Sequence, residues 1–513
     1  WGCAFARPCL STRPGLTAPV RAASWGVCVA SEAQRTHTRM LSSFISMTLA
    51  VTPSDFLIAS LPGLSPPPTF KQYAGLLPIG DAAGTELYFW FVESARSPAK
   101  DPLVFWTNGG PGASSVAFGF WTEHGPFRLS NSSGIVRPVP YNHSWNRIAN
   151  VLYVEMPSGV GYSHSRNANK YRNVTDAAAA ADTYTFLQRW LDVFSGYKGH
   201  PFYVTGESYG GHYVPTIAKA ILDGGGPLLA QTKGFLIGNP GINSDWYYNV
   251  NEYAFVTYMW SHGLIPSPAY TAARDACGWG SFLTDCRQDA THPSPACRAA
   301  TSAALKYVPS PLDPYDVLAP TCARTAADAA AADASVVRDQ PFLRRLRETH
   351  GADSTPRYDP CLSDLTPAYM NRADVRAAVH APPASLHERP WPTTPPGWHY
   401  NQGVAGEKAD IARLFPDFFA RAPHWRLAVV SGTADSAVPF LGTERWMECL
   451  GLPVEDDWRP WHLDRDVAGM VKRWAPDLSL VTVKGCGHTI PYSCPEKGLA
   501  FLANYLNRSR GCE

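Results

Sequence analysis

One segment organises this sequence: Thr205-Gly206-Glu207-Ser208-Tyr209-Gly210-Gly211-His212-Tyr213. The apolar run before it predicts a buried strand, and apolar residues after it recur at the spacing of one helix face. Glycines two residues before and after Ser208 carry no Cβ atom, so the chain can turn sharply and expose the serine hydroxyl. A serine in such a strand-to-helix turn is typical of a nucleophile elbow. Because short Gly-x-Ser-x-Gly patterns also arise by chance, the elbow needs a base, an acid and an oxyanion hole elsewhere in the chain.

Length and composition indicate a globular protein. The 513 residues are enough for one large domain with insertions or for two to three ordinary domains. Hydrophobic residues make up 45% of the chain and charged residues only 17%, which is not typical of a disordered protein. The formal net charge of +1 gives no electrostatic basis for binding nucleic acid or an anionic membrane. We expect no nucleic-acid partner, and a homodimer is left open.

Cysteines and glycosylation sequons favour an oxidising, secretory route. Four of the 12 cysteines lie between residues 277 and 322, a segment poor in apolar periodicity where disulfides would be useful. Residues 44–51 are a candidate hydrophobic core of a signal peptide, and no other apolar run reaches the ~20 residues that span a bilayer. We therefore expect an extracellular or a vacuolar/lysosomal protein. The candidate glycosylation sites are Asn131, Asn142, Asn173 and Asn507.

Strand and helix patterns alternate along most of the chain, which predicts an α/β fold with a mostly parallel central sheet and helices on both faces. Residues 1–55 are expected to be an N-terminal extension that includes any targeting signal, and residues 56–245 the first part of the core. Residues 246–375 have clustered cysteines, scattered prolines and an Ala/Asp-rich stretch, so we interpret them as an insertion or cap over the carboxyl edge of the sheet. Residues 376–513 resume the α/β pattern as the second part of the core. Strands are predicted at 71–77, 86–93, 103–107, 150–154, 202–204, 235–237, 426–431 and 480–484, with a helix from 176 to 194.

Four candidate site segments each follow a predicted strand: Gly109-Gly110, Ser208, Asp435 and His488. Open α/β sheets gather their functional sites at the carboxyl edge, where all four segments should meet. The chain order Ser, Asp, His is the one expected of the α/β-hydrolase fold. Each motif alone has a plainer interpretation as a turn or a helix cap. Their agreement in order and position predicts a serine hydrolase.

The residue types fit nucleophilic catalysis. A serine hydroxyl is a poor nucleophile until a base takes its proton, and His488 can do that for Ser208. Asp435 would fix the imidazole tautomer and stabilise the imidazolium. The backbone N–H groups of Gly110 and Tyr209 would hold the developing oxyanion.

Longer motifs surround these residues: Asn108-Gly109-Gly110-Pro111-Gly112 with Glu123-His124-Gly125-Pro126-Phe127, Gly206 to Pro215, Ser431-Gly432-x-x-Asp435-x-x-x-Pro439, and Gly485-x-Gly487-His488-x-x-Pro491. Together they resemble the sequence blocks of the serine carboxypeptidase family, and the resemblance covers about residues 56–510. It implies an α/β-hydrolase fold and the release of C-terminal residues from peptides or proteins through an acyl-enzyme. No metal and no cofactor is implied.

The resemblance assigns the same triad and the same two oxyanion donors as the residue types do. It further implies four residues that bind the free C-terminal carboxylate of the substrate: Trp106, Asn108, Glu123 and Glu207. Two glutamates that face a carboxylate repel it unless protons are shared. We therefore expect raised pKa values for Glu123 and Glu207 and stronger peptide binding at acidic pH.

Some positions depart from the family pattern. Ala113 stands where the family usually has a cysteine, which leaves Cys361 without its usual partner. Thr433 replaces the first aspartate of the usual Gly-Asp-x-Asp block, and Thr489 replaces a common methionine after the histidine, which puts specificity on the leaving-group side in doubt.

Cys486 and Cys494 flank His488 and are candidates for a disulfide with each other. A Cys/His zinc site there is disfavoured because no fourth ligand stands at a suitable spacing.

Two other functions are considered beside a carboxypeptidase. An acyltransferase of the serine carboxypeptidase-like type would use a sugar-ester donor, but it has no need for the carboxylate-binding set. A protective or chaperone-like binding protein would not need a complete triad.

Overall fold

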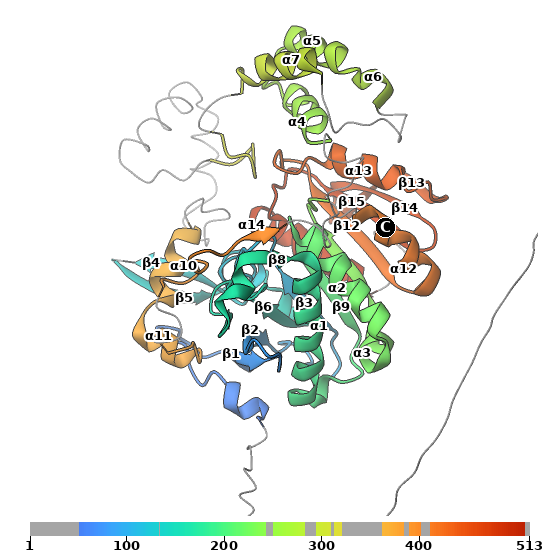
Figure 1. Ribbon diagram of the computed structural model, residues 1–513. Helices are drawn as coiled ribbons and strands as arrows, with labels where there is room; N and C mark the ends of the chain where they lie inside the picture. Colours follow the sequence, from blue (N-terminus) through green and yellow to red (C-terminus); the bar gives the residue numbers. More distant parts are fainter. Residues whose placement is uncertain are drawn as a thin grey trace, which may run out of the picture. The chain divides into compact units, whose positions relative to one another are not determined.

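The computed structural model describes most of the chain from residue 51 to residue 507 (Figure 1). The described residues are 51–132, 134–242, 250–282, 294–308, 312–320, 362–383, 389–401 and 411–507. Cys361, the Ala/Asp-rich stretch and residues 44–50 of the candidate signal segment lie outside them. The boundaries expected for the N-terminal extension and for the insertion stay predictions.

Among the described residues, 11 strands form one sheet with the order β1-β2-β6-β3-β9-β10-β12-β15-β14-β13, and β7 pairs with β2. Neighbours from β6 to β15 pair in parallel. At the two edges of the sheet, β1, β2 and β7 on one side and β14 and β13 on the other pair with their neighbours in an antiparallel manner. The predicted α/β-hydrolase class is confirmed, with a parallel centre and antiparallel edges. The bounds are β1 (Gln72–Pro78), β2 (Thr85–Val92), β3 (Leu103–Thr107), β6 (Asn150–Val154), β7 (His164–Ser165), β9 (Phe202–Glu207), β10 (Thr232–Gly238), β12 (Arg426–Gly432), β13 (Val454–Leu463), β14 (Asp466–Trp474) and β15 (Leu478–Val483).

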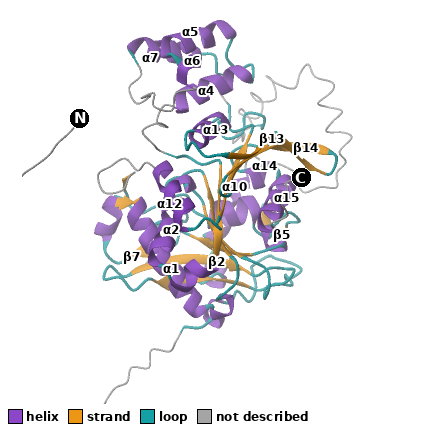
Figure 2. Cartoon of the chain, turned by 90° about the vertical axis from the view of Figure 1, so that its right-hand side faces the viewer, coloured by secondary structure: helices purple, strands orange, loops and turns teal. Residues whose placement is uncertain are grey.

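Side chains alternate along each strand and divide the core into two apolar clusters, one on each face of the sheet. In β3, Leu103 and Phe105 belong to one cluster and Val104 and Trp106 to the other. Helices α1 (Asp176–Val193), α2 (Gly210–Gly224) and α12 (Phe415–Arg421) contribute to the first cluster. The π-helix η2 (Val116–His124) and α15 (Pro495–Asn507) contribute to the second. Figure 2 shows strands between the α1, α2 and α12 group and α15.

The helix after the elbow buries the face that its sequence predicts. Its apolar positions have no exposed surface, and each buried valine or isoleucine side chain stabilises the fold by about 1.5–3 kcal/mol. These positions are Val214, Ile217, Ala218 and Ile221.

Smaller elements complete the core. Two separate pairs of strands are β4 (Phe127–Ser132) with β5 (Ile135–Pro140), and β8 (Val174–Thr175) with β11 (Tyr400–Asn401). The remaining helices of the core are α3 (Gly226–Gln231), α13 (Phe440–Glu448) and α14 (Ile490–Ser493). Short 3-10 turns are η1 (Pro53–Phe56), η3 (Trp145–Arg147), η4 (Ala168–Asn173), η5 (Ser195–Tyr197) and η6 (Ile411–Leu414). No described helix is long and apolar enough to cross a membrane.

The described parts of the predicted insertion are helices and one segment of turns, residues 312–320, and they contact the loops of the core. A disulfide between Cys277 and Cys297 ties α5 to α7. The Tyr258 hydroxyl of α4 donates a hydrogen bond of 3.0 Å to the carbonyl of Thr433. The Tyr315 carbonyl accepts a hydrogen bond of 2.6 Å from the N–H of His488. The helices are α4 (Val250–Ser261), α5 (Ser267–Cys277), α6 (Trp279–Phe282), α7 (Pro295–Leu305), α10 (Leu362–Met370) and α11 (Ala373–Ala378).

Candidate active site

The chain turns sharply at Ser208, between β9 and α2. Ser208 has a φ of 60°, in the left-handed region that a non-glycine residue adopts at a cost of roughly 1–3 kcal/mol. Its N–H donates to the Gly238 carbonyl at 2.9 Å, and its own carbonyl accepts from Gly211 and Gly241 at 2.9 Å each. These hydrogen bonds from the surrounding backbone hold the strained conformation. Ser208 itself is partly exposed.

Asp435 and His488 form a buried pair. His488 Nδ1 lies 2.7 Å from Asp435 Oδ2, which also accepts a 2.7 Å hydrogen bond from the Asn239 side chain. Asp435 Oδ1 accepts from the N–H groups of Ala437 at 2.8 Å and Val438 at 3.0 Å. Because Asp435 accepts at Nδ1, that nitrogen carries the proton and Nε2 is left as the basic nitrogen.

The environment of His488 suits a base. Burial opposes its charged form, but the charge and hydrogen bond of Asp435 outweigh burial and raise the pKa of His488. Nε2 is buried and has no hydrogen-bond partner among the described residues. His488 shares the lining of a small cavity with Glu207 and Asn239. The geometry thus places the Asp–His pair beside the residue that precedes Ser208.

The glycine-rich loop after β3 packs against the elbow. A Cβ atom on Gly109 would lie 2.2 Å from the backbone nitrogen of Tyr209, so only glycine fits there. Gly110 has a φ of 107°, which also favours glycine. Neither the N–H of Gly110 nor that of Tyr209 has a hydrogen-bond acceptor among the described residues. Both groups can therefore donate to a developing oxyanion.

Asn108 is hydrogen-bonded to each of the other three predicted carboxylate-binding residues, Trp106, Glu123 and Glu207. Its side-chain NH2 donates to Glu123 Oε1 at 2.7 Å and to Glu207 Oε1 at 2.9 Å. Its side-chain oxygen accepts from the Trp106 indole N–H at 2.7 Å and from the Gly119 N–H at 3.0 Å, which fixes the amide orientation. Both glutamates are buried, and Glu207 directly precedes Ser208.

The two glutamates hold protons near neutral pH. Burial raises the pKa of Glu123 to about 7, although hydrogen bonds from Asn108 and Glu207 act in the opposite direction. Burial, followed by the charge of Glu123, raises the pKa of Glu207 well above its ordinary value. A hydrogen bond between two carboxyl groups needs one proton, so Glu207 is the protonated partner. The raised pKa values agree with the expectation from the sequence.

Sequence reasoning missed two polar residues that support the site. Asn239 follows β10, has a φ of 41° and donates a hydrogen bond to Asp435. The sequence feature that could have identified it is an asparagine directly after a predicted strand, at the carboxyl edge of the sheet. Asp176 accepts hydrogen bonds from the hydroxyl groups of Tyr209, at 3.2 Å, and of Tyr400. Its place at the start of a predicted helix is also typical of an ordinary acidic first turn, so the pattern alone could not single it out.

One departure from the family pattern and one predicted disulfide are found in the structure. Thr433 Oγ1 accepts a 2.8 Å hydrogen bond from the Gly485 N–H, so it joins the Asp and His loops. Cys486 and Cys494 form a disulfide, as their placement predicts. No group of three residues able to hold a metal ion occurs in the part of the chain that the structure describes.

The side chains of the predicted glycosylation sites are accessible. All four asparagines are exposed: Asn131, Asn142, Asn173 and Asn507. Their glycosylation stays a prediction.

A family model described as serine carboxypeptidase matches residues 62–508. The chain belongs to the serine carboxypeptidase family. Two curated members of this family align with most of the length of this chain. Serine carboxypeptidase-like 26 of Oryza sativa subsp. japonica is 32% identical over 460 residues, which are 88% of this chain and 89% of the relative. Putative serine carboxypeptidase-like 30 of Arabidopsis thaliana is 33% identical over 462 residues, 88% of each chain.

A solved structure supports the fold of this serine carboxypeptidase family member. The crystal structure of Kex1(delta)p, a prohormone-processing carboxypeptidase from Saccharomyces cerevisiae, superposes with a TM-score of 0.64. The alignment covers 89% of this chain and 96% of that chain, at 19% sequence identity. At that identity the likeness bears on the fold alone.

Proposed function

We propose that this member of the serine carboxypeptidase family is a peptidase that releases C-terminal residues from peptides and proteins. One observation carries the proposal: the buried Asn108–Glu123–Glu207 group directly beside Ser208. A carboxylate needs hydrogen-bond donors, and a protonated carboxyl group is one. Both N–H bonds of the Asn108 amide are directed at the glutamates, whereas Glu123 Oε2 is buried without a hydrogen-bond partner among the described residues, so a proton on that oxygen is free to be donated to the substrate. A substrate held there by its free carboxylate places its last peptide bond at the elbow.

Acylation follows from the arrangement of the Asp–His pair. The Oγ atom of Ser208 forms a bond with the peptide carbonyl carbon while its proton passes to His488 Nε2. The N–H groups of Gly110 and Tyr209 donate to the resulting oxyanion, and Asp435 stabilises the imidazolium. His488 then gives the proton to the amine nitrogen as the C–N bond breaks, and the C-terminal residue leaves.

Deacylation repeats these steps with water. His488 takes a proton from water, the water oxygen attacks the ester carbonyl of Ser208, and the Ser208 oxygen leaves with the proton that His488 returns. Each group of the chain ends in its starting protonation state.

A mass ladder tests the proposal. A peptide with a free C-terminus is incubated with the wild-type protein and with Ser208→Ala, and the same peptide with a C-terminal amide is the matched control. We expect stepwise loss of C-terminal residues with the wild type only, and much slower loss from the amide. Transfer of an acyl group without any ladder would indicate an acyltransferase. Peptide binding that Ser208→Ala leaves unchanged, without turnover by the wild type, would indicate a binding protein.

We also propose maturation in the secretory pathway, with an extracellular or vacuolar/lysosomal destination. Two disulfides among the described residues and four exposed sequon asparagines support it. Enzymatic removal of N-glycans should lower the mass of the mature protein, and an unchanged mass would contradict glycosylation.

A further inference from the structure

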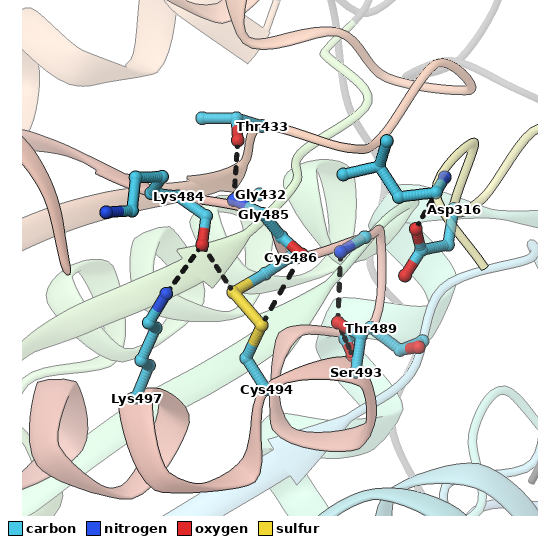
Figure 3. Close-up of a disulfide and its surroundings, with 12 residues drawn as sticks. Asp316, Gly432, Thr433, Lys484, Gly485, Cys486, Thr489, Ser493, Cys494 and Lys497 are labelled. Carbon is cyan, nitrogen blue, oxygen red and sulfur yellow. Dashed lines mark hydrogen bonds between the residues drawn. A yellow bond between two sulfur atoms is a disulfide. The ribbon is translucent and has the colours of Figure 1, made fainter. Parts of the chain in front are cut away.

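A disulfide encloses His488. The bond joins Cys486 to Cys494 across a sequence separation of 8, and His488 lies within the closed loop. The loop begins after β15 and ends where α15 begins; Figure 3 shows the bond between these two segments. Cys486 is fully buried, whereas Cys494 is partly exposed. The bond therefore ties the connection that carries His488 to the start of the next helix.

The buried half of this disulfide also contacts the loop of Asp435. The carbonyl of Cys486 accepts a 2.7 Å hydrogen bond from the N–H of Ala434, the residue before Asp435. A Cβ atom on Gly432 would lie 2.3 Å from that carbonyl oxygen, so the two loops are in tight contact. The position of Cys486 thus sets the spacing between the Asp and His loops.

Within the enclosed loop, the Gly487 N–H donates to Ser493 Oγ at 2.9 Å, the His488 N–H donates to the Tyr315 carbonyl at 2.6 Å, and Ile490 packs in the core. Just outside the loop, the Lys497 ammonium donates to the Lys484 carbonyl at 2.7 Å and joins the same two chain segments as the disulfide. Figure 3 shows Ser493 and the contact between Lys497 and Lys484 around the disulfide. α14, which lies inside the loop, has only four residues, too few for a stable helix on its own.

The imidazole depends on its backbone for orientation. Among the described residues, the ring of His488 has one hydrogen-bond partner, Asp435 at Nδ1, and Nε2 has none. The hydrogen bond to Asp435 and the contact with the Tyr315 ring, whose centroid lies 5.1 Å from that of the imidazole, orient His488 only while the backbone of its loop stays in place. A displacement of about 1 Å in such a site can cost about 100-fold in rate.

We propose that the Cys486–Cys494 bond is a positioning device for the catalytic base. It fixes the loop so that His488 keeps Nδ1 on Asp435 and presents Nε2 to Ser208. This inference rests on the proposed triad, and it assigns the disulfide a role in catalysis in addition to any role in stability.

The chain supplies a matched control in the Cys277–Cys297 bond. Each disulfide has one buried and one partly exposed cysteine, so Cys494→Ser and Cys277→Ser both remove the more exposed sulfur. The control bond has a sequence separation of 20, against 8 for the bond around His488. Because a longer closed loop restricts the unfolded chain more, Cys277→Ser should lower the unfolding midpoint at least as much as Cys494→Ser.

The readout is the rate at which a small fluorophosphonate labels Ser208. In this reaction the Ser208 oxygen forms a bond to phosphorus, fluoride leaves, and the serine proton passes to His488. Because the reagent is not a peptide, the rate reports on the Ser–His pair whatever the natural substrate is. We expect Cys494→Ser to slow labelling by about 10- to 100-fold and to move the pH midpoint of the reaction downward, since His488 loses contact with Asp435. Cys277→Ser should leave the rate within about twofold of the wild type.

Several results would overturn the inference. One such result is that Ser208 of the Cys494→Ser variant is labelled at the wild-type rate and with the wild-type pH midpoint. Another is that Cys277→Ser slows labelling as much as Cys494→Ser does. The variant with Cys486→Ala and Cys494→Ala covers the case in which the free thiol of Cys486 disturbs folding. If neither variant folds while Cys277→Ser does, the bond is a folding requirement and the inference is wrong. A wild type that is labelled at Ser208 but releases no residues from peptides would contradict the proposed function alone.

Discussion

Two buried carboxyl groups at the same edge of the sheet, those of Asp435 and Glu207, have different surroundings. Each accepts a hydrogen bond from an asparagine amide, at 2.7 Å and 2.9 Å respectively. Asp435 also accepts from two backbone N–H groups and from His488 Nδ1, so each of its two oxygens has two hydrogen-bond donors. Glu207 instead faces Glu123, a second carboxyl group, and this neighbour favours the protonated form.

The difference shows that burial alone does not determine how a carboxyl group acts. Hydrogen-bond donors and an opposite charge favour the ionised form, and a like charge favours the neutral form. At this sheet edge, the first environment suits stabilisation of an imidazolium and the second suits binding of an anion. The comparison can be tested by changing each acid to its amide.

The largest effect is expected for Asp435→Asn. The amide has nearly the same size as the acid but presents an NH2 group, so the tautomer of His488 that leaves Nε2 basic loses its support. We expect kcat for a peptide to fall by about 10⁴-fold with the fold intact. Steady-state kinetics and circular dichroism measure the two quantities, and a loss below about tenfold would show that the charge of Asp435 is not needed.

An intermediate effect is expected for Asn239→Ala. This change removes one donor from Asp435 and leaves the other three, and a hydrogen bond to a charged group contributes about 1.5–3 kcal/mol. We expect kcat to fall roughly 10- to 100-fold, with KM little changed. A variant that alters KM and leaves kcat unchanged would place Asn239 in substrate binding instead.

The smallest effect is expected for Glu207→Gln. Glutamine mimics a protonated glutamate, because both side chains carry no charge and both have a hydrogen-bond donor beside an acceptor oxygen. At pH 5 we expect KM for a free-carboxylate peptide to change by less than about tenfold and kcat to stay near the wild-type value. A loss of kcat as large as that of Asp435→Asn would mean that Glu207 acts as an ionised group, and the comparison would fail.

Local patterns predicted much of the fold and of the site. The glycines around Ser208 predicted the turn, and the apolar runs predicted the parallel strands whose ends carry Asp435 and His488. The β13–β14 hairpin was not predicted because β13 is mostly exposed, with one buried residue, and neither strand contains a continuous apolar run. The role of Tyr400 depends on a contact with Asp176, more than 200 residues earlier in the chain, and such pairings leave no signal in the local sequence.

The central claim is that a proton-sharing pair of glutamates binds the C-terminal carboxylate of a peptide. Burial raises the pKa of Glu123 to about 7 and that of Glu207 well above its ordinary value, so both carboxyl groups are protonated below pH 7. Above pH 7 the pair gains a negative charge, because Glu123 ionises while Glu207 keeps its proton. The most direct measurement is KM between pH 5 and pH 8 for one peptide with a free C-terminus and for the same peptide as a C-terminal amide. We predict that KM of the free peptide rises by about tenfold per pH unit above pH 7, whereas KM of the amide stays nearly constant. Affinity for the free peptide that increases steadily up to pH 8 would contradict the account.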